Sequence, residues 1–139
     1  MENISLDLTL EEVIKELDDK NLLYMTSGKI KELKNNVLQK LYLSRTELLD
    51  YHIKLKEYRY VDEIDEMKIG AFIRWFNLNK TENMKLTNGG FIIDVKSTSD
   101  NIQIICKNNM NRIFSLILNE CIIFQKMSSQ EKILVKIID

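Results

Sequence analysis

The spacing of apolar residues changes character near residue 60. Before this point apolar side chains recur mostly at the spacing of a helix that buries one face. After it, short β-branched and aromatic runs are separated by turn residues, and three of the four glycines (Gly70, Gly89 and Gly90) lie there. The sequence therefore predicts an α+β protein. Residues 1–60 would form a helical arm, and residues 61–139 a small β-barrel with a C-terminal helix.

Two helices are predicted in the arm. Thr9 and Glu12 have the spacing of a capping box, which predicts that the first helix begins at Thr9. The second helix is predicted from about Lys29 to about Tyr58, and its length of about 45 Å exceeds the width of a small barrel. Its apolar stripe therefore needs either the first helix, folded back as a hairpin, or another chain in a coiled coil. A second interpretation breaks this helix at Ser44, which would cap a new segment. The stripe expected to mediate association comprises Ile30, Leu33, Val37, Leu41, Leu48 and Leu55.

Five short strands are predicted after residue 60. They span residues 71–76, 91–96, 102–107, 113–118 and 121–126. Alternation places Phe91, Ile93 and Val95 on one face of the second strand. Ser128 and Glu131 form another capping box, which predicts the start of the C-terminal helix. Five strands of this length, joined mostly by short turns, predict an antiparallel SH3-like barrel.

The titratable residues form no pattern typical of catalysis. His52 is the only histidine, and nucleophilic catalysis needs a base beside the nucleophile. Cys106 and Cys121 lie in separate apolar runs, which favours buried reduced thiols over a disulfide or a zinc site. The acidic run at 62–66 has oxygen ligands suited to Mg²⁺, but we interpret it as a solvated linker. We expect no enzyme, no metal and no cofactor.

Charge and hydropathy narrow the choice of partner and compartment. The formal net charge is -1, whereas proteins built on non-specific phosphate binding usually carry a basic excess. No stretch approaches the roughly 20 apolar residues of a membrane span. Together with the reduced thiols, this predicts a cytoplasmic protein that does not bind a membrane.

Aromatic and basic residues of the first predicted strand are the best candidates for a binding surface. Arg74, Trp75 and Phe76 are consecutive, so Trp75 faces away from the other two. Small barrels bind single-stranded nucleic acid through aromatic and basic side chains, and proteins through aromatic grooves. A core position for Trp75 is the alternative, because one face of every strand must fill the core. The basic residues expected on neighbouring strands and turns are Lys68, Lys85, Lys107 and Arg112.

Four short runs between residues 43 and 134 form a distinctive set. They are YRYV at 58–61, Gly70 with IRW at 73–75, Leu86 with GGF at 89–91, and IFQK at 123–126. In these runs the chain resembles small uncharacterised proteins encoded by giant nucleocytoplasmic large DNA viruses. The resemblance implies a virus-encoded protein that acts in the cytoplasm of an infected cell or in the virion. It implies no activity and no catalytic residue.

These observations favour a non-enzymatic binding or assembly module. The arm would associate with a second copy or a protein partner, and the barrel would dock protein or nucleic acid. The alternative is a nucleic-acid-binding barrel that serves viral transcription, replication or packaging. An enzyme that uses the acidic run and a metal is the third hypothesis.

Overall fold

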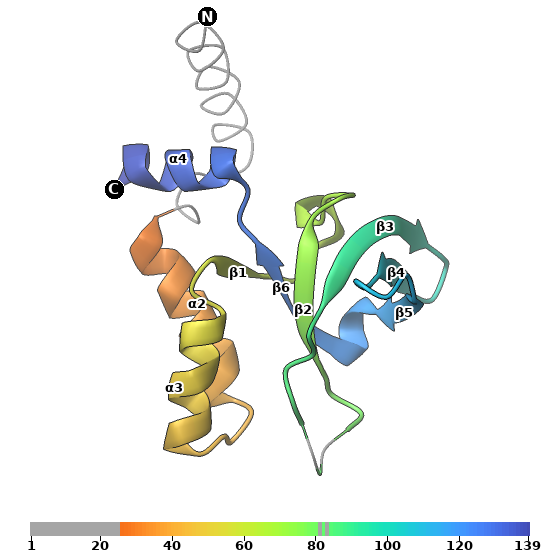
Figure 1. Ribbon diagram of the computed structural model, residues 1–139, viewed down its shortest axis with the longest axis horizontal. Helices are drawn as coiled ribbons and strands as arrows, with labels where there is room; N and C mark the ends of the chain where they lie inside the picture. The colour runs from red at the N-terminus through yellow and green to blue at the C-terminus, as the bar shows by residue number, and fades with distance from the viewer. Residues whose placement is uncertain (1–25, 81, 83) are drawn as a thin grey trace, which may run out of the picture.

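The computed structural model describes residues 26–80, 82 and 84–139. Its α-helices are α2 (Ser27–Gln39), α3 (Arg45–Lys54) and α4 (Ser129–Ile138), and its short 3₁₀ helices are η2 (Ile64–Glu66) and η3 (Leu118–Glu120). The strands are β1 (Tyr58–Val61), β2 (Phe72–Asn77), β3 (Gly90–Ser97), β4 (Ile102–Lys107), β5 (Ile113–Ile117) and β6 (Cys121–Lys126). They form one antiparallel sheet in the order β1-β6-β2-β3-β4-β5 (Figure 1). The first predicted helix, starting at Thr9, lies outside the described residues.

The predicted five-stranded SH3-like barrel is wrong. The sheet has six strands and is open, because its outermost strands, β1 and β5, do not pair with each other. The missed strand is β1, which occupies residues predicted to end the long helix. Its pairing with β6 runs from Tyr58 opposite Lys126 to Val61 opposite Ile123. Aromatic and β-branched side chains suit such a ladder, but a partner at the far end of the chain leaves no local signal. The predicted division between residues 60 and 61 falls inside this strand.

The predicted helix over residues 29–58 is also wrong, because the chain leaves the helical path after Gln39. Tyr42 then adopts the left-handed conformation, with a φ of 54°. Ser44 caps α3: its hydroxyl accepts a hydrogen bond from the Glu47 N–H, and the Glu47 carboxylate accepts one from the Ser44 N–H, both at 3.2 Å. The break at Ser44, considered as the second interpretation, is therefore what forms. A reciprocal cap of this kind stabilises a new helix start.

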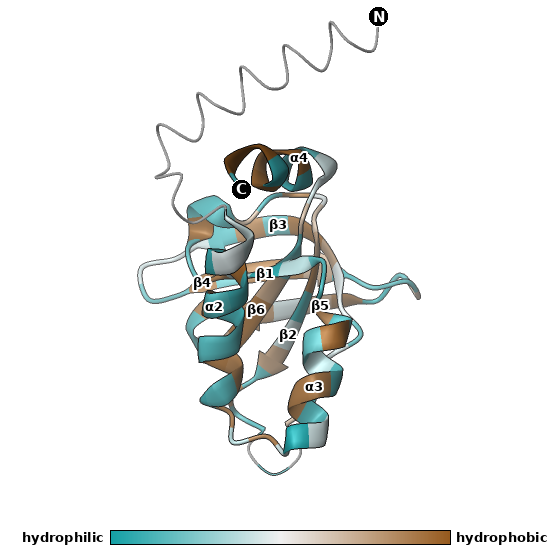
Figure 2. Cartoon of the chain, turned by 90° about the vertical axis from the view of Figure 1, so that its left-hand side faces the viewer, coloured by the Kyte–Doolittle hydropathy of each residue, from teal (hydrophilic) through white to brown (hydrophobic). Residues whose placement is uncertain are grey.

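Helices α2 and α3 cover one half of one face of the sheet, over β1, β6 and β2 (Figure 2). Leu38 of α2 and Leu55 at the end of α3 are fully buried with Phe76 of β2 and Phe124 of β6. The ring of Tyr51 meets Phe76 edge to face, with 5.1 Å between ring centroids. Aromatic pairs in this geometry add to the free energy gained from burial alone. We call this set the helix-side core.

The opposite face of the sheet carries a second core, to which every strand contributes. Within the part of the chain that the structure describes, it contains no residue from an α-helix, so the sheet curves over its own side chains. Part of this curvature arises in β3, which bends in Figure 1 and has an irregular register between Ile92 and Asp94. The buried members of this strand-side core are Val61, Met67, Ile73, Trp75, Ile92, Ile104, Cys106, Leu116 and Ile123.

Arg59 on β1 attaches two further elements to the sheet. Its Nε donates to Glu131 of α4 and its Nη1 donates to Glu66 of η2, both at 2.7 Å. The side chains of Arg59 and Glu131 are only 13% and 7% exposed. Glu131 also closes the capping box that begins α4, as predicted. One guanidinium therefore joins the edge strand, the β1–β2 connection and the last helix.

Removal of the Arg59 cation should leave the buried carboxylate of Glu131 and the 30% exposed carboxylate of Glu66 without their partner. We expect Arg59→Met to lower the free energy of unfolding by about 3–5 kcal/mol, measured by urea denaturation. Lys132→Met is the matched control. Lys132 pairs with Glu57 at 3.0 Å, but these side chains are 40% and 53% exposed, so the expected loss is below about 1 kcal/mol. Equal losses in the two variants would contradict the structural role of Arg59.

The left-handed conformation of Tyr42 should be relieved by glycine. The side chain is 96% exposed and loses no packing when removed. A left-handed L-residue costs roughly 1–2 kcal/mol, whereas glycine has a smaller entropic cost of roughly 0.5–1 kcal/mol. We expect Tyr42→Gly to raise the free energy of unfolding by about 0.5–1 kcal/mol and Tyr42→Ala, which keeps a Cβ, to give no gain. Equal values for both variants in thermal denaturation would contradict this account.

Candidate functional site

The two aromatic residues of the predicted binding surface lie in the cores. Trp75 is 6% exposed and belongs to the strand-side core, whereas Phe76 is fully buried in the helix-side core. This split follows from strand alternation, which sends neighbouring side chains to opposite faces. The core position considered for Trp75 is the one observed, and neither ring is available to stack on a ligand at the surface.

Arg74 holds a loop against the sheet. Its Nε donates a hydrogen bond to the carbonyl of Thr87 at 2.8 Å, and the N–H of Thr87 donates to the carbonyl of Trp75 at 3.0 Å. Gly89 follows in this loop with a φ of 95°, and a Cβ there would lie 2.3 Å from the carbonyl oxygen of Ile73. Only glycine allows the loop to approach β2 this closely. The guanidinium is therefore engaged within the chain.

The four other basic candidates do not gather at one place. Lys68 precedes β2, and Lys85 lies in the loop that returns from its other end. Lys107 and Arg112 lie at opposite ends of the tight β4–β5 turn, and all four side chains are exposed. Only Lys107 and Arg112 are therefore neighbours, and the described residues provide no continuous basic track beside Arg74.

The predicted association stripe packs inside the chain. Ile30 and Leu55 are buried, and the other four residues are partly buried. Three of these four, Val37, Leu41 and Leu48, pack against the helix-side core. On the outer side of α3, Leu49 and Ile53 are 56% and 74% exposed. Most of the stripe therefore packs within one chain and contributes to its folding.

The titratable groups of the described residues form no catalytic arrangement. Burial raises the pKa of the thiols of Cys106 and Cys121 to about 11 in each case, so both stay protonated at neutral pH. His52 contacts the side-chain oxygen of Asn35 at 3.3 Å, and burial and the charge of Lys34 lower its pKa. Across the described residues, the acidic run at 62–66 included, no three His, Cys, Asp or Glu side chains are grouped to hold a metal ion.

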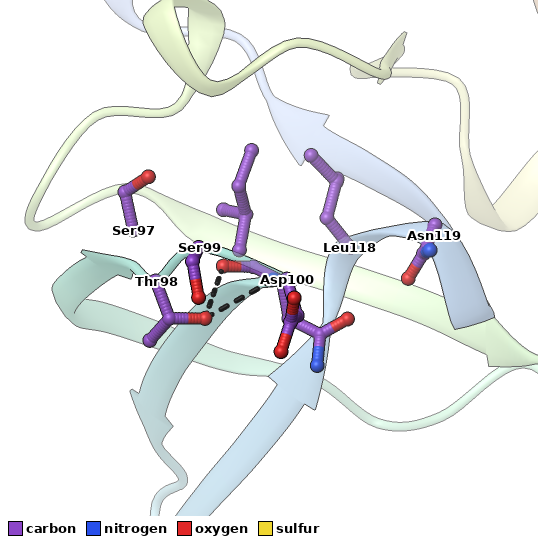
Figure 3. A pocket seen from close by; sticks show the side chains of 8 residues that line it. Ser97, Thr98, Ser99, Asp100, Leu118 and Asn119 are labelled. Atoms are coloured by element: carbon purple, nitrogen blue, oxygen red, sulfur yellow. Dashed lines mark hydrogen bonds between the residues drawn. The ribbon is translucent and has the colours of Figure 1, made fainter.

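An open pocket lies between the β3–β4 turn and η3 (Figure 3). Its polar groups are used to close the turn: the Thr98 hydroxyl donates to the Asn101 carbonyl at 2.9 Å and accepts from the Asn101 N–H at 3.1 Å. Asp100 is the only titratable residue in its lining. A single exposed carboxylate supplies neither an acid–base pair nor a metal site. The pocket is therefore a feature of the turn.

Exposed apolar side chains gather instead where β3, β4 and β5 lie side by side. This set, which we call the β5 patch, comprises Phe91, Ile93, Met110, Ile113 and Phe114, which are 47%, 40%, 75%, 66% and 40% exposed, respectively. Phe91 and Ile113 both pair with Lys107 of β4 and so flank it on the helix side of the sheet. Phe114 pairs with Cys106 and lies beside them at the same edge, on the face of the strand-side core. In Figure 1 these strands lie on the side of the sheet away from α2 and α3. Scattered exposed apolar residues are ordinary, but a cluster is typical of an interaction site.

The patch includes an open strand edge. Within the described residues β5 pairs only with β4. The Asn108 N–H donates to the Arg112 carbonyl at 3.0 Å, so this pair is hydrogen bonded. Hydrogen-bonded and non-hydrogen-bonded pairs alternate in an antiparallel ladder, and Phe114 therefore bonds toward β4. It follows that Ile113 and Ser115 direct their backbone N–H and C=O groups to the free edge.

Sequence reasoning missed this surface. Alternation placed Phe91, Ile93 and Val95 on one face of the strand, but of these three only Val95 packs against the strand-side core. The irregular register in β3 places Ile92 and Val95 on the core side, opposite core residues of β4. Alternation cannot reveal an extra residue in a strand. The sequence feature that could have indicated this surface is the adjacent apolar pair Ile113 and Phe114, because it puts apolar side chains on both faces of one strand.

Comparisons with known proteins give no relative. No family model matches the chain, and neither a curated protein nor a solved structure is significantly similar to it. None of the described helices combines the length and the apolar character needed to cross a membrane.

The single tryptophan reports directly on the core position of Trp75. We expect its fluorescence emission to be blue-shifted relative to free tryptophan and its quenching by iodide to be several-fold weaker, because the ring is shielded from water. Both properties should approach those of free tryptophan after unfolding in urea. Iodide quenching as strong in the folded protein as in free tryptophan would contradict the buried position.

Proposed function

We propose that this protein is a non-enzymatic binding module that docks a protein partner at the β5 patch. The observation that carries the proposal is an apolar patch that coincides with an open strand edge. Free backbone groups at such an edge can accept an added strand, while apolar side chains beside it supply burial. Most of the predicted stripe of α2 and α3 is used for packing within the chain, so the docking surface is assigned to the sheet.

The chemistry of the edge favours a protein over a nucleic acid. Residues 113–117 carry no charge, whereas nucleic-acid binding depends on several cations along one surface. Lys107 and Arg112 are the basic residues at the β4–β5 turn beside the patch. With the rings of Trp75 and Phe76 buried, the aromatic platform of the alternative hypothesis is lost.

The cellular compartment is also part of the proposal. Cys106 and Cys121 are both unpaired and lie in or against the strand-side core. Reduced thiols of this kind are ordinary in the cytoplasm. We therefore propose a cytoplasmic binding module, in line with the expectation from the sequence.

A comparative binding experiment tests the docking surface. Immobilised wild-type protein is compared with Ile113→Lys, which places a charge in the patch, and with Ile53→Lys on α3. The two isoleucines are 66% and 74% exposed, so neither change should unfold the chain. We expect proteins retained by the wild type to be lost at least tenfold with Ile113→Lys and to be kept with Ile53→Lys. Equal retention by both variants, or loss only with Ile53→Lys, would contradict the assignment.

A further inference from the structure

We propose that Asn88 is a site of spontaneous covalent modification, at which its side-chain amide is converted to a carboxylate through a cyclic imide formed with Gly89. The inference goes beyond the proposed function, because it concerns the loop before β3 and needs no partner. Asn88 and Gly89 form the one Asn-Gly pair of the sequence. The Asn88 side chain is exposed to water, and asparagines in exposed loops are among the thermally labile residues of proteins.

The reaction needs only these two residues and water. The main-chain nitrogen of Gly89 attacks Cγ of Asn88, so a bond forms between these two atoms and a five-membered imide closes. The bond from Cγ to the side-chain nitrogen breaks, and ammonia leaves with the proton of the Gly89 N–H. Water then adds to one of the two imide carbonyls. Cleavage at Cγ gives aspartate, whereas cleavage at the main-chain carbonyl gives isoaspartate, in which the chain continues through the former side chain.

The nitrogen of Gly89 is open to this role in the folded chain. Glycine has no Cβ, so no side chain crowds the attacking nitrogen. Among the described residues, the Gly89 N–H donates no backbone hydrogen bond. Ring closure at this position therefore does not have to break such a bond, whose loss would add to the barrier.

The fold requires the residue that makes the pair reactive. Gly89 has a φ of 95°, and a Cβ there would lie 2.3 Å from the carbonyl oxygen of Ile73 and 2.7 Å from the ring of Phe72. A larger residue would slow ring closure by crowding the nitrogen, but it would also push the loop away from β2. The close approach of the loop to β2 therefore keeps a glycine next to Asn88.

The two products differ in their effect on the loop. Before the pair, the Thr87 carbonyl accepts from Arg74 Nε at 2.8 Å, and the Thr87 N–H donates to the Trp75 carbonyl at 3.0 Å. After the pair, Gly90 lies opposite Ile73 in the β2–β3 ladder. Isoaspartate adds a methylene carbon to the main chain between these two fixed points, and main-chain bond lengths do not adjust. We therefore expect isoaspartate to break one of the two attachments and aspartate to leave both intact.

The first test follows the reaction in the folded full chain. The wild type and Asn88→Gln, whose longer side chain closes a ring far more slowly, are incubated in mildly alkaline water labelled with heavy oxygen. Peptide mapping then measures conversion at each asparagine. Asn79 and Asn109 are internal controls, because both are exposed and precede residues with a Cβ.

We expect wild-type Asn88 to convert at least about tenfold faster than Asn79 and Asn109, since only Asn88 precedes a glycine. Each event should incorporate heavy oxygen, and Asn88→Gln should stay unconverted at this position. Conversion at Asn88 no faster than at the two control asparagines would overturn the proposal.

A second measurement separates the folded from the unfolded chain. Low urea concentrations leave most molecules folded but raise the unfolded fraction many-fold. We expect the rate at Asn88 to change little under these conditions, because the folded chain reacts. A rate that rises in proportion to the unfolded fraction would overturn the assignment of the site to the folded protein.

A third measurement compares the products. Both carry an added negative charge, so ion exchange separates them from the wild type, and enzymatic methylation specific for isoaspartate identifies that form. We expect the isoaspartate form to unfold at a lower urea concentration than the wild type, and Asn88→Asp to unfold at the wild-type concentration. An isoaspartate form as stable as the wild type would overturn the inferred effect on the loop.

Discussion

The two helices that cover the sheet are too small to cover all of it. Six strands at a spacing of about 4.8 Å make a sheet roughly 25–29 Å wide, whereas two helices side by side span about 20 Å. α2 and α3 lie over β1, β6 and β2, where the aromatic contacts of Tyr51, Phe76 and Phe124 hold them. On the other half of that face, over β3, β4 and β5, neither α2 nor α3 shields the apolar side chains of the strands from water. The exposure of Phe91 and Ile113 on that face is a direct consequence.

On the opposite face, too, the described helices do not cover the sheet, and its apolar side chains are buried in a different way. No α-helical residue among those described joins the strand-side core, and the sheet bends so that β1 and β5 contribute to one cluster without pairing. β1 is an edge strand of only four residues, and the Arg59 ion pairs and the contact with α2 hold it in place. β5 lacks this support among the described residues. The two edges of the sheet therefore differ: within the described residues, β1 is held by contacts with other elements, whereas β5 pairs only with β4.

Several elements could be predicted because their signals are local. Alternation located the strands from β2 to β6, and the capping box of Ser128 and Glu131 located the start of α4. β1 could not be found in this way, since the strand it pairs with among the described residues is β6, at the other end of the chain.

The predicted binding surface at Trp75 and Phe76 was wrong for a related reason. A surface position for either ring requires one face of β2 to be exposed to solvent, but both faces of β2 are buried. The patch on β3 and β5 depends on an irregular register and on incomplete helix cover, and neither can be read from residue spacing.

Amide hydrogen exchange in β5 measures the central claim most directly, since it reports which backbone groups are free. In dilute protein the account predicts fast exchange at Ile113 and Ser115 and slow exchange at Phe114, which bonds toward β4. Equal protection of all three amides in dilute protein would contradict an open edge at β5.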